Sequence, residues 1–375
     1  MLTRLYIDNF ACFVNFEFRP ARTNLLIGDN GTGKTTVLEV LGHIIDLNRL
    51  GISVETCFPF YRRTAWDNRD KQTFEIEVEH ESELFKYILE IDHAKGPSET
   101  RTTTIAREEV THEGKPLFRF AQGRVELYKD DYSRGPSFEF SNKRSFLANI
   151  EQSSENNKLV WFLSWLGRIW RFHLDPASIK RGGVSQGETT GISVLGDNFS
   201  SFYRHLMQDQ PQVTERIKEE LGSVISGFDH MRLQPLGDRS KGLFVEFSSA
   251  ERTPVYPLPF SFLSDGQVVL IVLYTILHAL GERSTLLCID EPDNFVALRE
   301  IQPWLQRLSD RREAQAIIIS HNPEVIDYLA ADTTFLFTRR GSGLTRLEEV
   351  NFSYEGGLKA SEQIARGLIG SRNAG

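Results

Sequence analysis

The segment Gly28-Asp29-Asn30-Gly31-Thr32-Gly33-Lys34-Thr35 constrains the fold of this chain more than any other. Two glycines separated by four residues and followed by Lys and Thr form the phosphate-loop pattern. Backbone N–H groups of such a turn point into one concavity and bind phosphate oxygens. Lys34 would contact the β- and γ-phosphates, and the Thr35 hydroxyl would bind Mg²⁺. We count Thr36 among the nucleotide-binding residues as well.

The residues on either side of this loop fit the motif. Asn24 to Ile27 is a short apolar run, which predicts a buried parallel strand. After the loop, apolar residues recur at helical spacing and predict a helix that ends between Leu47 and Gly51: Val37, Leu38, Val40, Leu41, Ile44 and Ile45. Strand, glycine turn and helix together favour a phosphate site over a chance glycine-rich turn.

Composition is that of an ordinary soluble globular protein. The 375 residues are 40% hydrophobic and 25% charged, enough for two lobes or one large domain with insertions. A net charge of -8 argues against nucleic-acid binding by bulk charge and still allows a local basic patch. The three cysteines form no metal pattern and suit a reducing cytosol, so we expect a cytoplasmic protein. No signal peptide is visible, and the longest apolar run, Val268 to Leu280, is too short to span a membrane.

Alternating apolar residues predict several strands in the first half of the chain. Residues 2–18 predict a strand pair, and residues 74–78 and 85–91 predict a hairpin. Residues 100–105 and 125–128 extend it into an antiparallel sheet. Between these regions, residues 51–71 predict an irregular loop. Its Arg62 and Arg63 could face phosphate or DNA, although a solvated loop is the default interpretation.

The middle of the chain has mixed patterns. Residues 146–172 predict a helical region whose aromatic rows form a core or inter-lobe contact, with a base-stacking platform as the alternative. Residues 180–198 are rich in glycine and predict a loop. A helix is expected from Pro211, a strand at residues 243–247 and a final strand at residues 335–337.

Ser264-Asp265-Gly266-Gln267 opens the long apolar helix. By itself this segment predicts a helix N-cap. Ser264, Gly266, Gln267 and a helix N-terminus are also groups that could bind a γ-phosphate from the side opposite the phosphate loop.

Two further buried strands end in polar residues. Residues 286–290 end at Asp290, which could hold the Mg²⁺ shell through water, and the next residue, Glu291, could orient the attacking water. Residues 317–319 are followed by Ser320 and His321, and we assign His321 to the γ-phosphate. The alternatives are an acidic strand end before a turn and a structural histidine.

The order and spacing of these motifs resemble those of ABC-type ATPase heads. Within them, the resemblance is to the group of repair and chromosome-organising (SMC) heads, overcoming-lysogenisation-defect ATPases and AAA-family ATPases of prokaryotic defence loci. Five segments carry it: residues 2–10 (first strand), 28–35 (Walker A), 264–267 (signature), 290–294 (Walker B into D-loop) and 320–323 (switch histidine). It implies an α/β P-loop NTPase fold with a mixed parallel sheet, an antiparallel β subdomain and a helical lobe. The expected parts are residues 1–95 and 256–375 as the ATPase core and 96–255 as an insertion or helical lobe.

The resemblance also implies an activity. Glu291, His321 and Lys34 would hydrolyse ATP, with Mg²⁺ held by Thr35 and Asp290. Two or more copies would associate head to head around sandwiched ATP. The head would gate a separately encoded effector, such as a nuclease, or nucleic acid, in anti-phage defence or DNA maintenance. DNA is a candidate partner, and a membrane is not expected.

Three departures from the family accompany this reading. The Q-loop glutamine is not obvious, and Gln152 is the one candidate. No coiled-coil arm is predicted, and the tail after the last strand is expected to be too short for the Toprim nuclease domain of lysogenisation-defect proteins.

Two other functions are alternatives to this interpretation: the ATPase subunit of a membrane transporter, and a non-hydrolysing, ATP-dependent scaffold.

Overall fold

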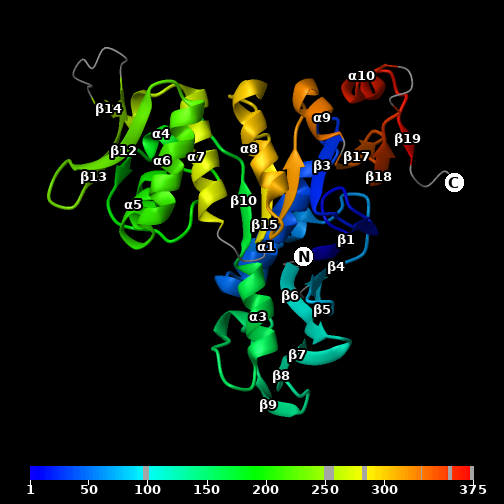
Figure 1. The fold of residues 1–375 in the computed structure, drawn as a ribbon. Helices are drawn as coiled ribbons and strands as arrows, with labels where there is room; N and C mark the ends of the chain where they lie inside the picture. The colour runs from blue at the N-terminus through cyan, green and yellow to red at the C-terminus, as the bar shows by residue number, and fades with distance from the viewer. Residues whose placement is uncertain (96–100, 249–256, 281–284, 331, 354–356, 372–375) are drawn as a thin grey trace. The chain divides into compact units, whose positions relative to one another are not determined.

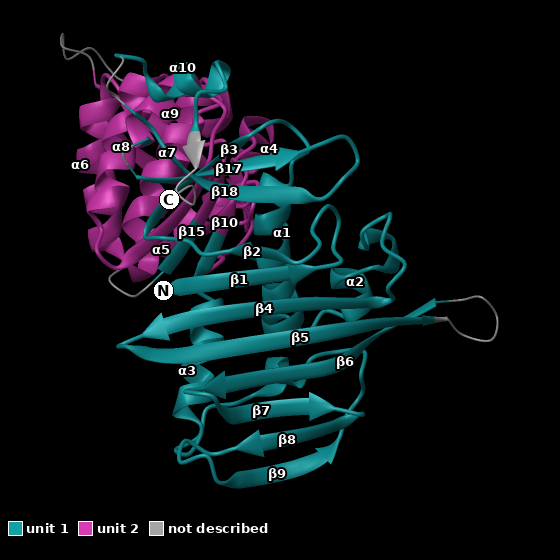
Figure 2. Cartoon of the chain, turned by 90° about the vertical axis from the view of Figure 1, so that its right-hand side faces the viewer, with its two compact units in different colours: residues 1–170, 284–287, 330–375 teal, residues 171–283, 288–329 magenta. Residues whose placement is uncertain are grey.

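The computed structural model describes residues 1–95, 101–248, 257–280, 285–330, 332–353 and 357–371 (Figure 1). The chain forms two compact units, each made of discontinuous segments (Figure 2). Unit 1 contains residues 1–170, 284–287 and 330–375, and unit 2 contains residues 171–283 and 288–329.

Unit 1 contains an eight-stranded sheet in which every neighbouring pair is antiparallel (Figure 2). The predicted strand pair, hairpin and meander all belong to it. In sheet order the strands are β2 (Phe16–Phe18), β1 (Leu2–Asp8), β4 (Lys71–His80), β5 (Glu83–Lys95), β6 (Arg101–His112), β7 (Lys115–Ala121), β8 (Arg124–Tyr128) and β9 (Arg134–Glu139).

Period-two patterning explains why these residues form strands. On β4, Phe74, Ile76 and Val78 are fully buried, whereas the intervening glutamates lie on the other face. There Arg4 contacts Glu75 at 2.6 Å, and Lys86 contacts the same carboxylate at 2.8 Å. One face of the sheet therefore covers a core, and the other carries ion pairs.

Unit 1 also holds a group of strands around β3 (Thr23–Gly28). β3 pairs in parallel with β17 (Thr333–Arg339), as the apolar run before the phosphate loop predicts. β17 pairs antiparallel with β18 (Thr345–Asn351), and β18 with β19 (Gly370–Ser371). Helix α1 (Lys34–Arg49) follows the loop and ends where predicted. The strand expected to be last is therefore followed by β18, α10 (Ala360–Ala365) and β19.

Two predictions in unit 1 need correction. The expected loop at residues 51–71 contains two short helices, α2 (Val54–Cys57) and η1 (Phe60–Arg62). The helical region at residues 146–172 is η2 (Phe146–Asn149), α3 (Asn157–Leu166) and the strand β10 (Ile169–Phe172). Gly167 ends α3, and the Arg168 carbonyl then accepts a hydrogen bond from the Leu286 N–H at 3.2 Å. Long-range strand pairing therefore outweighs the local helical spacing at residues 169–172. On α3 the aromatic residues Phe162 and Trp165 are buried, as the expectation of a core contact requires.

Unit 2 is mainly helical. Helix α7 (Asp265–Ala279) is buried along ten consecutive residues, 268–277, and the strand β16 (Ala314–Ile319) is buried throughout. The strand β15 (Thr285–Asp290) is also buried throughout; its residues from Cys288 onward belong to unit 2, and those before it belong to unit 1. The remaining elements are α4 (Pro176–Arg181), β11 (Val184–Ser185), α5 (Phe199–Asp209), α6 (Pro211–Val224), β12 (Phe228–Pro235), β13 (Lys241–Phe247), β14 (Leu258–Pro259), η3 (Phe260–Phe262), α8 (Leu298–Asp310) and α9 (Pro323–Leu329). The predicted helix at Pro211 and strand at residues 243–247 are present; α5, α8 and β12 were not predicted.

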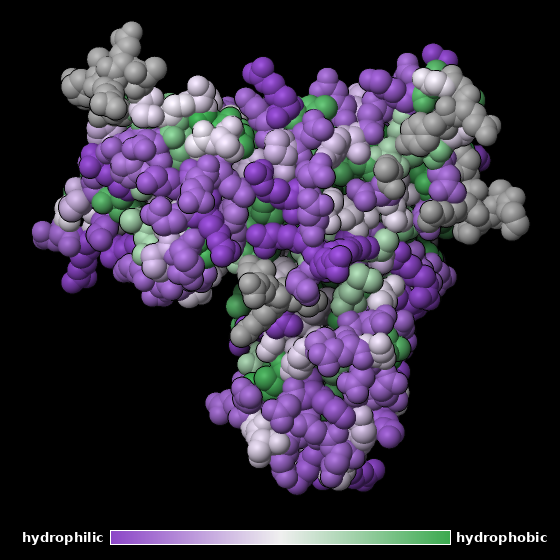
Figure 3. Space-filling model, viewed as in Figure 1, coloured by the Kyte–Doolittle hydropathy of each residue, from purple (hydrophilic) through white to green (hydrophobic). Residues whose placement is uncertain are grey.

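Among the described residues, none of the helices combines the length and apolar character needed to cross a membrane. The face shown in Figure 3 is mostly hydrophilic, with only small apolar patches between charged and polar side chains.

Candidate functional site

The phosphate loop of unit 1 joins β3 to α1 and is closed by its own lysine. The Lys34 side chain is buried, and its Nζ donates hydrogen bonds to the carbonyl oxygens of Gly28 at 2.7 Å and Asp29 at 2.9 Å. The Thr32 hydroxyl donates to the Asp29 carbonyl at 2.8 Å. The loop is therefore folded into one turn around the ammonium group.

Two glycines of this loop are required by packing. Gly28 has φ 138°, and a Cβ there would lie 2.2 Å from the carbonyl oxygen of Phe337 on β17. Gly33 has φ 103°, and a Cβ there would lie 2.7 Å from Cys12 Sγ and 2.9 Å from the Phe13 ring. Since neither position accepts a side chain, the core of unit 1 fixes the path of the loop.

The start of α1 suits an anion. Gly33 is its N-cap, and among the described residues no side chain caps it and no acidic residue lies in its first turn. The first N–H groups of a helix lack intrahelical partners, and the helix dipole makes this end positive. Asp29, Asn30, Gly31 and Thr35 are exposed, and Thr36 is half-buried. This geometry and the buried ammonium fit a nucleotide phosphate.

An arginine outside the motif also holds the loop. Arg339, at the end of β17, donates from Nη1 to the Gly31 carbonyl at 3.2 Å and from Nε to the Gly343 carbonyl at 2.7 Å. Its guanidinium lies 5.5 Å from the ring centroid of Trp66, which is 42% exposed. Local sequence patterns could not predict this contact, because 308 positions separate Arg339 from Gly31.

In unit 2, the carboxyl end of β15 carries the acidic pair. Asp290 is buried, whereas Glu291 leaves the strand with φ 51°, a left-handed conformation that costs a non-glycine residue energy. The Glu291 N–H donates to the Ile319 carbonyl at 2.9 Å, and Asn294 Nδ2 donates to Glu291 Oε2 at 2.5 Å. His321 Nε2 lies 3.7 Å from Glu291 Oε1. Unit 2 therefore brings Asp290, Glu291 and His321 to one edge.

A buried carboxylate supports this edge. Asp293 accepts a hydrogen bond from the Ser320 hydroxyl at 3.1 Å, and that hydroxyl in turn accepts from the Asn322 N–H at 3.1 Å. Burial, together with the nearby negative charge of Glu291, raises the pKa of Asp293 above its usual value. Its other oxygen, Oδ1, has no partner among the described residues. Asp293 thus links the segment after β15 to the histidine segment.

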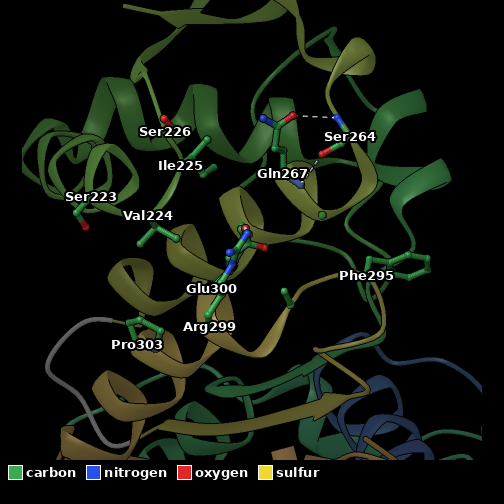
Figure 4. A pocket seen from close by; sticks show the side chains of 13 residues that line it. Ser223, Val224, Ile225, Ser226, Ser264, Gln267, Phe295, Arg299, Glu300 and Pro303 are labelled. Carbon is green, nitrogen blue, oxygen red and sulfur yellow. Dashed lines mark hydrogen bonds and ion pairs between the residues drawn. The ribbon is translucent and has the colours of Figure 1, made fainter. Parts of the chain in front are cut away.

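The signature segment caps α7 with a reciprocal pair. The Ser264 hydroxyl accepts from the Gln267 N–H at 3.2 Å, and the Ser264 N–H donates to Gln267 Oε1 at 3.0 Å (Figure 4). A Cβ on Gly266 would lie 2.7 Å from the Phe295 carbonyl oxygen. Only glycine therefore lets the start of α7 approach the loop that follows Glu291 this closely.

These residues line a cavity of about 830 Å³ within unit 2 (Figure 4). The end of α6 and the start of α8 form its other walls, including Ser226, Arg299 and Glu300. Phe295 borders the cavity and is 46% exposed. The start of α7 is thus open to a molecule outside this unit's own core.

The predicted site residues are divided between the units. The Walker A residues belong to unit 1, and Ser264, Gly266, Gln267, Asp290, Glu291 and His321 belong to unit 2. Gln152, the Q-loop candidate, is exposed in an irregular segment of unit 1. His173, which the sequence did not single out, lies with its Nδ1 3.7 Å from Asp290 Oδ2. Sequence spacing could not reveal that contact, because 117 positions separate the two residues.

The two arginines considered for a DNA-facing role have internal partners. Arg62 pairs with Glu39 and lies over the Phe10 ring. Arg63 contacts Asp70 at 2.8 Å and lies 4.2 Å from the Phe60 ring centroid. Both cations are therefore used within unit 1, although Arg62 remains partly exposed.

The chain is similar to one protein family and to solved structures of known fold. Residues 23–327 match the family model described as "AAA domain, putative AbiEii toxin, Type IV TA system". An SMC head domain from Thermotoga maritima is 13% identical, with a TM-score of 0.50, over 94% of this chain and 99% of that chain. An SmcHead crystallised with the C-winged helix domain of ScpA is 11% identical, with a TM-score of 0.54, over 95% and 99%. A comparison with curated proteins found no match. The predicted fold, an SMC-like P-loop ATPase head, is confirmed.

Proposed function

Because the chain belongs to this AAA-domain family, whose model covers residues 23–327, we propose that it binds ATP with Mg²⁺ and hydrolyses it. The observation that carries the proposal is the phosphate loop of unit 1. No side chain among the described residues caps its helix N-terminus, its glycines Gly28 and Gly33 are fixed by packing, and its Lys34 ammonium donates hydrogen bonds to carbonyl oxygens of the loop. These are the groups that a triphosphate requires.

The roles of the remaining residues follow from their chemistry. Thr35 and Asp290 would hold Mg²⁺, which neutralises phosphate charge when bound. Glu291 would orient the attacking water and accept its proton, since its carboxylate is partly exposed and fixed by Asn294. His321 would contact the γ-phosphate, as its ring lies beside Glu291 and is 39% exposed.

The test separates binding from hydrolysis. Lys34→Ala should weaken binding of a fluorescent ATP analogue at least tenfold, and Glu291→Gln should preserve binding while phosphate release falls by a factor of roughly 10² to 10⁴. Lys218→Ala and Glu219→Gln on the exposed face of α6 are matched controls and should change neither quantity. Purified protein that neither binds nor hydrolyses ATP in the presence of Mg²⁺ would contradict the proposal.

We propose further that ATP joins two or more copies head to head. The start of α7 lines an open cavity, and Gly266 packs directly against the loop after Glu291. A signature segment so placed could bind the nucleotide of a second copy. Light scattering should show Glu291→Gln as a dimer or higher oligomer with ATP and as a monomer without it. A variant that stays monomeric with saturating ATP would exclude the sandwich.

The partner is proposed to be a separately encoded effector, such as a nuclease, or nucleic acid, in a cytoplasmic anti-phage or DNA-maintenance system. The family description includes the words "putative AbiEii toxin, Type IV TA system", and the SmcHead structure contains the C-winged helix domain of ScpA. Pull-down with Glu291→Gln and ATP should enrich one protein encoded beside this chain. DNA binding, if present, should weaken with salt. It need not depend on Arg62 and Arg63, which already have ion-pair partners.

A further inference from the structure

His173 lies beside the carboxylate that ends β15. Its Nδ1 is 3.7 Å from Asp290 Oδ2. The two residues end neighbouring strands of one sheet, because His173 directly follows β10 and Asp290 is the last residue of β15 (Figure 1). The His173 N–H donates to the Val194 carbonyl at 2.9 Å, and α4 begins three residues later, at Pro176. The backbone therefore holds this imidazole at the acidic edge.

The separation of the two side chains suggests that a third group joins them. A distance of 3.7 Å exceeds that of a direct hydrogen bond. Nitrogen and oxygen ligands each lie about 2.0 to 2.2 Å from a small divalent cation, so two ligand atoms at this spacing can share one ion with minor adjustment. The Asp290 side chain is 6% exposed and that of His173 is 54% exposed, so the imidazole can approach the carboxylate from the solvent side.

We propose that His173 Nδ1 is a ligand of the divalent cation that Asp290 helps to hold, an inference that rests on the proposed ATP-dependent function. Imidazole is a softer ligand than an amide oxygen and favours transition metals. The site should therefore prefer Mn²⁺ to Mg²⁺ more strongly than an all-oxygen site would.

A purely structural ion pair is the competing explanation. His205 and Asp209 form such a pair on α5, with Nδ1 2.9 Å from Oδ2 and well within hydrogen-bond reach. His205 therefore provides the matched control, because its removal deletes a histidine–aspartate pair from the same unit without touching the acidic edge.

The experiment uses the full chain with ATP and Mn²⁺ as the probe. Pulsed electron paramagnetic resonance of bound Mn²⁺ detects ¹⁴N coupling when an imidazole is a ligand. We expect this coupling in the wild type and in His205→Gln, and its loss in His173→Gln. Mn²⁺ affinity in the presence of ATP should fall roughly tenfold in His173→Gln, while Mg²⁺ affinity should change less.

Two negative outcomes can be told apart. Wild-type protein that binds Mn²⁺ and ATP without ¹⁴N coupling, and with unchanged metal affinity in His173→Gln, would overturn the role of His173 and leave the proposed function intact. Protein that binds neither ATP nor Mn²⁺ with ATP would instead contradict the proposed function itself, and this inference with it.

Discussion

The phosphate loop of unit 1 and the acidic edge of unit 2 are held in place in different ways. The loop is fixed by backbone packing, since Gly28 lies against Phe337 and Gly33 against Cys12. The acidic edge depends on a few side-chain contacts around Glu291, which is 28% exposed and has a left-handed backbone. The phosphate-binding groups of the loop therefore share the stability of the core of unit 1, whereas the side chains proposed to react at Glu291 and His321 are partly exposed. Substitutions should therefore separate folding from chemistry.

The largest effect is expected where the loop meets the core. Gly28→Ala must place its Cβ 2.2 Å from the Phe337 carbonyl in a backbone conformation that only glycine adopts easily. Strain and overpacking should together lower the free energy of unfolding by about 4 kcal/mol. Urea titration measures this loss. Gly114→Ala is the control, because its φ of 73° is strained but no atom lies within 4 Å of the new Cβ.

An unchanged unfolding midpoint in Gly28→Ala would show that β17 can move away and that the loop is not fixed by packing. A loss in Gly114→Ala as large as in Gly28→Ala would attribute the effect to backbone strain alone.

The core of unit 1 also contains a titrating group. Glu108 on β6 is buried and accepts hydrogen bonds from the Tyr87 hydroxyl at 2.8 Å and the Ser145 hydroxyl at 2.9 Å. Burial raises the pKa of Glu108 to about 7, although the two hydrogen bonds partly oppose this shift. In the unfolded chain the carboxyl keeps its ordinary value of 4.5. Ionisation of this carboxyl therefore opposes folding.

The second prediction follows from the sign of this pKa shift. Below pH 4.5 both states are protonated and Glu108 has no effect; between pH 4.5 and 7 only the unfolded state loses its proton, so stability falls as pH rises. The loss should level off above pH 7 at roughly 3 kcal/mol. Glu108→Gln should remove most of this pH dependence in urea titrations at pH 5 and pH 8, whereas the exposed Glu151→Gln should retain it. Parallel pH profiles for wild type and Glu108→Gln would refute the assignment.

The motifs of the proposed site could be predicted from the sequence because each is a short run with its own chemistry. The phosphate loop, the strand that ends at Asp290 and the cap at Ser264 all have the local structure expected of them. Contacts between runs could not be predicted. Nothing local relates Gly266 to Phe295 or His173 to Asp290, because strand order and helix packing bring them together.

Two elements, β10 and α8, could not be predicted from local sequence patterns, because tertiary contacts outweigh those patterns. Residues 169–172 continue a helical spacing of aromatic residues, yet they form β10 because β15 offers a pairing partner. Helix α8 contains Pro303, a residue that normally ends a helix. Its buried face, which includes Ile301, Trp304 and Leu308, outweighs that local preference. Tertiary packing thus decided the elements where local signals were mixed.

The third prediction concerns the contact between the signature and the loop after Glu291. In a helix without other contacts, Gly266→Ala would stabilise by about 1 kcal/mol. Here the new Cβ would meet the Phe295 carbonyl at 2.7 Å, so we expect a net loss of about 2 kcal/mol and slower phosphate release. ATP affinity should stay unchanged, because the phosphate loop belongs to unit 1. Gly191→Ala, which meets no atom within 4 Å, is the control. Weaker ATP binding in Gly266→Ala would contradict this prediction, because it would show that ATP affinity also depends on the start of α7.

The smallest effect is expected at the side chain that orients Glu291. Asn294→Ala removes the 2.5 Å hydrogen bond to Glu291 Oε2 and leaves the backbone contacts of the segment in place. Without this hydrogen bond Glu291 is less well oriented, so the activation free energy should rise by about 1 kcal/mol and kcat for phosphate release should fall roughly fivefold. The unfolding midpoint and the ATP affinity should change little. Asn294→Asp should be slower still, because a second carboxylate would repel the Glu291 carboxylate. If Asn294→Asp were as fast as the wild type, Glu291 would not depend on this contact, and the acidic edge would be as firmly fixed as the phosphate loop.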